Sequence, residues 1–134
     1  MAAGRYSFVI EQGATTDFEI QYKDSASVAV SLVDHQAKMQ IRSTQDTAGT
    51  LILTLSSSLA NDGTGLNLSG SNGTTPITSG SIGVKISAHS SSLFDFTEAF
   101  YDLEISSGSS YPTVTRILEG KVQLNKNVTS GSFT

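Results

Sequence analysis

The chain has 134 residues, a length at which one compact domain buries roughly two-thirds of the surface that its unfolded chain exposes. It has no cysteine, which excludes disulfides, thiolate metal sites and thiol nucleophiles. Its eight Lys and Arg are scattered singly at a net charge of -4, so we expect no nucleic-acid partner. No apolar run reaches the roughly 18 residues of a membrane helix, so we expect a soluble domain without a membrane partner.

Apolar and polar residues alternate through the first half of the chain, which places successive side chains on opposite faces of β-strands. In one of these strands Phe18, Ile20 and Tyr22 are expected to face the core. The dipeptide Asp62-Gly63 suits the tight turn of a hairpin. The predicted strands cover residues 6–11, 17–23, 28–32, 37–42, 51–55 and 66–68, with 37–42 and 51–55 as hairpin partners.

The second half continues the alternation with one interruption. The run Ser90–Phe94 is expected to form one turn of helix capped by a serine. The last strand has mixed faces, so it is expected to bend or bulge at Gly120. The strands predicted here cover residues 82–86, 100–105 and 114–124.

Short strands separated by turn signals, without a helix long enough for a crossover, indicate antiparallel connections. We therefore predict an all-β protein, an antiparallel two-sheet immunoglobulin-like β-sandwich. A small β-barrel is the alternative, because strand spacing does not show whether a sheet closes on itself. The predicted domain covers residues 1–127, and residues 128–134 are predicted to form a flexible C-terminal tail.

The polar residues predict no catalytic, cofactor-binding or metal site, and therefore no enzyme. His35 and His89 lie outside the usual metal-ligand spacings, and the sequence has no Gly-x-Ser-x-Gly motif. The densest acidic group is interpreted as a solvated or interface face, because two of its members alternate with apolar residues along one strand. A calcium site near its first two members is the alternative. The group consists of Asp95, Glu98, Asp102 and Glu104.

Several strand-like segments, with the turns between them, follow an order that is found in a known family. They are Tyr6–Gly13, Asp17–Tyr22, Ala37–Arg42, Tyr101–Ile105, Arg116–Val122 and Asn127–Thr129. In this order they resemble the small virion structural proteins of tailed, cyanophage-type bacteriophages, and the related immunoglobulin-like modules that anchor receptor-binding parts to baseplates. Val33-Asp34-His35 stands where the family usually has Leu-Thr.

The resemblance implies a non-enzymatic virion protein, assembled in the host cytoplasm, that acts in particle assembly at the tail or baseplate or attaches fibres. Its partners would be other phage structural proteins, and the chain would form a homo-oligomer or a symmetric array through exposed sheet edges. Capsid or neck decoration, binding of host-surface glycans and hydrolysis of the host surface are the alternatives. The candidate assembly contacts are Asp102, Glu104, Asn127, Val128 and Phe133.

Overall fold

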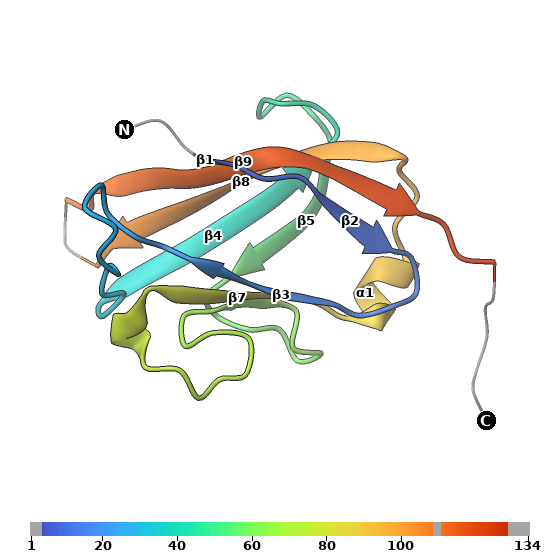
Figure 1. Ribbon diagram of the computed structural model, residues 1–134. Helices are drawn as coiled ribbons and strands as arrows, with labels where there is room; N and C mark the ends of the chain where they lie inside the picture. The colour runs from blue at the N-terminus through green and yellow to red at the C-terminus, as the bar shows by residue number, and fades with distance from the viewer. Residues whose placement is uncertain (1–3, 109–110, 129–134) are drawn as a thin grey trace.

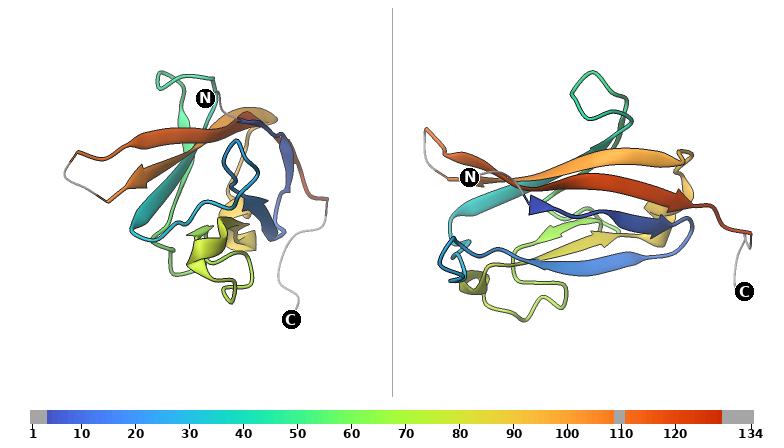
Figure 2. Two further views of the ribbon diagram at one scale, coloured as in Figure 1. Left: turned by 60° about the vertical axis from the view of Figure 1, so that its left-hand side comes forward. Right: turned by 45° about the horizontal axis from the view of Figure 1, so that its top comes forward.

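Two β-sheets pack face to face across one apolar core in the computed structural model, which describes residues 4–108 and 111–128 (Figure 1). The strands are β1 (Gly4–Arg5), β2 (Phe8–Glu11), β3 (Thr16–Gln21), β4 (His35–Arg42), β5 (Leu51–Ser56), β6 (Gly65–Asn67), β7 (Ser81–Ile86), β8 (Glu98–Ser107) and β9 (Val114–Asn125). A 3-10 turn, η1 (Ile77–Ser79), precedes β7, and a short helix, α1 (Ala88–Ser92), follows it. Figure 2 shows the two layers from two further directions.

The order of the strands identifies the fold. The large sheet has the order β1-β9-β8-β4-β5, with β2 also paired with β9, and the small sheet has the order β3-β7-β6. In immunoglobulin lettering, β3, β7 and β6 take the places of strands B, E and D, and β9, β8, β4 and β5 take those of G, F, C and C′. The predicted all-β, immunoglobulin-like sandwich is confirmed, and over the described residues the two sheets do not join into the alternative barrel.

The N-terminal segment departs from the predicted antiparallel pattern. β1 and β2 run parallel to β9, whereas the other neighbouring strands of both sheets are antiparallel. The expected opening strand is also broken at Tyr6 and Ser7. The Tyr6 N–H donates to Glu119 O over 3.0 Å, and the Ser7 hydroxyl oxygen accepts a hydrogen bond from a backbone N–H of the neighbouring strand β9. A Cβ on Gly120 would lie 2.1 Å from Tyr6 O, so glycine allows this close approach.

Two predicted features of the first half are corrected by the structure. Residues 28–32 form no strand. Within them only Ala29 makes a β-bridge, with Lys23, and the chain then turns away. The Asp62-Gly63 turn is not a hairpin turn, because the strands it joins, β5 and β6, belong to different sheets. The hairpin of β4 and β5 is confirmed by their antiparallel register.

Two further predictions are wrong by a few residues. The helix begins at Ala88, and its cap is Ser87, whose Oγ accepts a hydrogen bond from the Ser90 N–H over 3.0 Å. The irregularity of the last strand does not lie at Gly120. The register shift places Ile117 as the extra residue of β9, since its neighbours on both sides pair with successive residues of β8.

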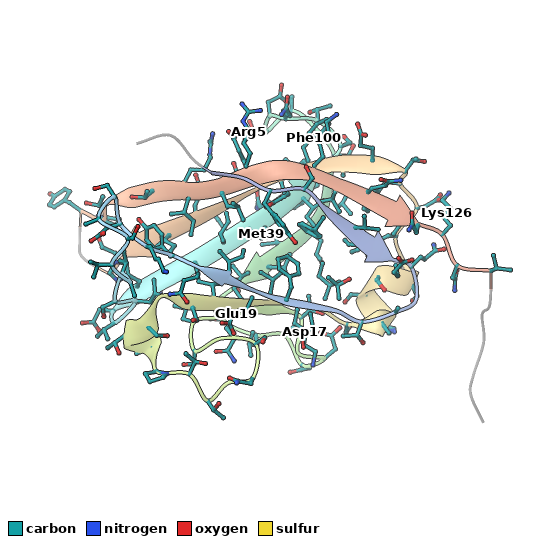
Figure 3. All side chains as sticks on the ribbon, viewed as in Figure 1. Arg5, Asp17, Glu19, Met39, Phe100 and Lys126 are labelled. Atoms are coloured by element: carbon teal, nitrogen blue, oxygen red, sulfur yellow. The ribbon has the colours of Figure 1, made fainter. Side chains whose placement is uncertain are left out.

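Side chains from both sheets fill the space between the layers, where Figure 3 places Met39. They alternate with outward-facing residues along β2, β3, β4 and β8, as the sequence pattern predicts, whereas in β7 Ser81–Val84 are all buried. The fully buried side chains of the strands include Ile10, Met39, Ile41, Leu55, Leu66, Ile82, Val84, Ile86, Leu103 and Val122.

Candidate assembly surface

One lateral side of the sandwich is open. β3 ends the small sheet there, and within the described part of the chain it pairs with β7 alone. On the same side β2 ends the large sheet, next to β9. Figure 1 looks onto this side, with β2 above β3. We call the side formed by β2 and β3 the open side.

The free edge of β3 presents a defined set of backbone groups. The Tyr22 N–H donates to Gly80 O over 2.8 Å, which continues the ladder between β3 and β7. Backbone groups of successive residues in a strand point to opposite edges, so those of Asp17, Glu19 and Gln21 point away from β7. Unpaired groups of this kind are a template for an added strand.

The two faces of β3 differ in polarity. The inner face is apolar and only partly buried, and within residues 4–108 and 111–128 no strand pairs with the outer edge of β3. As predicted, Phe18, Ile20 and Tyr22 face the core, and they are partly buried there. The inner face carries Phe18 and Ile20, with Tyr22 just beyond. The outer face carries exposed Asp17, Glu19 and Gln21, followed by exposed Lys23.

Aromatic rings line the open side between its two edges. The ring centroids of Phe8 and Phe18 lie 5.0 Å apart, which joins β2 to β3. Tyr6 stacks on Phe8 at 6.4 Å, yet it remains 48% exposed. The Tyr101 hydroxyl donates to Tyr6 O, and burial raises the pKa of this hydroxyl above its ordinary value. A hydrogen bond to the Tyr6 backbone thus holds the aromatic cluster in place, while the Tyr6 ring stays exposed.

Asp102 and Glu104, two of the predicted contacts, lie on the outer face of the large sheet. Asp102 Oδ2 forms an ion pair with Arg116 Nε at 3.2 Å, and Glu104 stands opposite Arg116 in the register. The loop between β4 and β5 rises above this face in Figures 1 and 2, and a hollow of about 210 Å³ lies beneath it. Phe100 lines this hollow.

The C-terminal candidates lie elsewhere. The Asn127 N–H donates to Gln12 Oε1 over 3.0 Å, so the chain reaches the turn between β2 and β3, at one end of the open side. Val128 is fully exposed. Phe133 lies outside the described residues, as does the rest of the predicted tail from 129 onward. The structure therefore brings Asn127, but not the pair on β8, to the open side.

The acidic residues of the calcium alternative do not converge. Asp95 pairs with Lys126 at 3.1 Å, and Glu98 pairs with Lys121 at 3.7 Å. Among residues 4–108 and 111–128, no three His, Asp or Glu side chains form a group that could hold a metal ion. The same part of the chain has no helix long and apolar enough to cross a membrane.

A polar cluster that the sequence analysis missed lies between the turn before β6 and the start of α1. The Asp62 carboxylate accepts hydrogen bonds from Ser87 Oγ at 2.6 Å, Ser90 Oγ at 2.9 Å and the Thr64 N–H at 3.0 Å. These donors, Ser87 first, hold the pKa of Asp62 well below its ordinary value. These hydrogen bonds join the turn before β6 to the start of α1, and we call the group of Asp62, Thr64, Ser87 and Ser90 the Asp62 clasp.

An apolar hollow lies between β5 and the segment after α1. It is lined by Ile52, Leu53 and Phe96, and beside them Leu93 is 72% exposed. Asp95, which also lines it, is held by Lys126 at the end of β9.

No model of a protein family matches the chain, and no curated protein matches it significantly.

Proposed function

We propose that the chain is a non-enzymatic structural protein of a tailed-phage particle that acts in particle assembly, at the tail or baseplate or as an attachment module for fibres. The observation that carries the proposal is the free edge of β3. An added strand gains backbone hydrogen bonds along such an edge and side-chain contacts on its inner face.

The chemistry of β3 supports strand addition. Natural domains usually protect an edge by making it short, by placing charged side chains or proline on it, or by a bulge or inward-pointing charges. β3 is 6 residues long and regular, it contains no proline, and its inner face is apolar. Its charges, Asp17 and Glu19, point outward, where they would flank an added strand without blocking it.

The sequence resemblance supports the phage particle as the site of assembly. One of the segments that carry the resemblance, Asp17–Tyr22, is largely the β3 edge itself. Two others belong to β8 and β9, the central strands of the large sheet. The resemblance and the assembly chemistry thus rest in part on the same residues.

The test is to purify phage particles from a host culture in which the gene is expressed, and to analyse them by mass spectrometry and immunogold labelling. We expect the chain in stoichiometric amounts, at the tail or baseplate. Its absence from purified particles would refute the proposal.

An edge variant connects the proposal to β3. In Glu19→Pro the proline replaces an N–H that faces away from β7, so the ladder inside the domain is kept and the free edge is blocked. We expect this variant to fold but to enter particles at least about tenfold less efficiently. Glu19→Gln, which keeps the N–H and a side-chain oxygen that can accept from Ser71, is the matched control.

A host-surface glycan-binding module is the second candidate, favoured by the hollow on the outer face of the large sheet. Phe100 offers an aromatic surface there, and Gln40 and Arg42 offer donors. The Arg42 guanidinium, however, already donates to Gly49 O over 3.1 Å and to Gln40 Oε1 over 3.0 Å. A glycan array separates the candidates, because binding that Phe100→Ala abolishes would support this one.

A further inference from the structure

We infer that β3 pairs with β3 of a second copy of this chain, antiparallel, about a two-fold axis that passes beside Ile20. The small sheets of the two copies would join into one continuous sheet. The inference rests on the proposed assembly function. It identifies a second copy of the chain as the partner that binds the open side.

The charges of β3 and of Lys23, two residues beyond its end, are self-complementary in this register. With Ile20 opposite Ile20, Asp17 of one copy stands opposite Lys23 of the other, and Phe18 stands opposite Tyr22. The two-fold axis produces each pair twice. Opposite charges and aromatic rings placed directly across a strand pair stabilise it. Glu19 faces the uncharged Gln21.

Hydrogen-bond direction agrees with the same register. Asp17, Glu19 and Gln21 turn their backbone groups to the free edge, so they would form the hydrogen-bonded pairs of the new ladder. Phe18 and Ile20 would form the non-hydrogen-bonded pairs, in which opposing side chains approach most closely. The apolar inner faces would therefore cover each other where the single domain leaves them partly exposed.

The neighbouring symmetric registers are less favourable. An axis at Phe18 places Asp17 opposite Glu19, and an axis at Glu19 places two Glu19 carboxylates opposite each other, so both bring like charges together. An axis at Gln21 pairs Glu19 with Lys23, but it sets Phe18 against Asp24 and shortens the overlap. The axis at Ile20 alone combines opposite charges with matched apolar residues.

Strand addition along one edge buries a small area, and interfaces below about 1,200 Å² are generally weak. We therefore expect the isolated dimer to have a dissociation constant in the micromolar range, which analytical ultracentrifugation can measure over a concentration series.

A symmetric cross-link tests the axis directly, because the chain has no cysteine of its own. In Ile20→Cys the two sulfurs would face each other in a non-hydrogen-bonded pair, whose Cα separation of about 4.5 Å lies within the range of disulfides. We expect mild oxidation to convert this variant to a covalent dimer. Phe18→Cys should not cross-link with itself, whereas an equimolar mixture of Phe18→Cys and Tyr22→Cys should.

Charge exchange provides an independent test that leaves the core intact. Asp17→Lys and Lys23→Glu each place like charges opposite each other twice, so each should weaken its own dimer at least about tenfold at low salt. Mixed together, the two variants restore opposite charges at both positions and should form a heterodimer. Lys38→Glu, an equal charge change at an exposed position of β4 in the large sheet, should leave the affinity unchanged.

Two results would overturn the inference: a wild-type chain that stays monomeric at millimolar concentration, or an Ile20→Cys variant that cross-links no faster than Phe18→Cys. These experiments use the purified chain, so they are independent of the particle analysis. A monomer that is found in particles would refute the β3 pair and leave the proposed function standing, and a dimer that is absent from particles would do the reverse.

Discussion

The two edges of the small sheet are built differently. β6 is 3 residues long, Leu66 within it is fully buried, and the Asp62 clasp fastens the preceding turn to Ser87 and Ser90. β3 is 6 residues long, and its inner side chains are only partly covered. Since both edges belong to one sheet, the contrast singles out β3 as the longer and less covered edge, the one at which we propose strand addition.

The largest expected effect on stability comes from comparing an alanine substitution on each edge of the small sheet. Leu66→Ala removes a fully buried side chain and should lower the free energy of unfolding by about 3 kcal/mol. Ile20→Ala on the half-covered edge should cost about 1 kcal/mol. Urea denaturation at low protein concentration, where a weak dimer is dissociated, measures both. Equal losses would mean that β3 is as well covered as β6.

A second test concerns the N-terminal segment that borders the open side. Gly120→Ala would place a Cβ 2.1 Å from Tyr6 O, so the segment must shift away from β9, at a cost of about 2 kcal/mol. Gly4→Ala is the matched control. Its Cβ would meet its nearest atoms at an ordinary 3.6 Å, so its effect should stay within about 0.5 kcal/mol. Similar stabilities of the two variants would contradict the close approach at Gly120.

The sequence predicts those features that depend on neighbouring residues. Alternation identified β2, β3, β4, β5, β7, β8 and β9, and the fold class followed from their number and spacing. It did not reveal that β1 and β2 run parallel to β9, because that pairing depends on the space that Gly120 leaves for Tyr6. Alternation describes the faces of a strand and says nothing about which strand lies beside it.

The candidate surfaces divide in the same way, into features that depend on neighbouring residues and features that depend on the whole fold. The outward direction of Asp102 and Glu104 could be predicted, because it depends on the period of one strand. The free edge of β3 could not, since an edge is a property of the sheet order. The Asp62 clasp could not either, because its serine partners are 25 and 28 residues away in the chain. An Asp-Gly turn and a serine before a helix are ordinary local signals, and only the fold brings them together.

The smallest and most specific expected effect concerns the Asp62 clasp, and it is the pH dependence of the protein's stability. Hydrogen bonds from Ser87, Thr64 and Ser90 lower the pKa of Asp62 in the folded state. The unfolded chain therefore takes up a proton at this carboxyl before the folded chain does. The stabilisation is fully present at neutral pH and is lost progressively as the pH falls below about 4.

Asp62→Asn should thus be less stable than the wild type at pH 7, and it should lose less of its remaining stability between pH 5 and pH 3. Ser90→Ala, which removes one donor and keeps the carboxylate, should fall between the two. Urea midpoints measured across this pH range test the prediction. If Asp62→Asn kept the wild-type slope, the Asp62 carboxylate would not stabilise the turn before β6, and the two edges of the small sheet would differ only in their length and in the burial of their side chains.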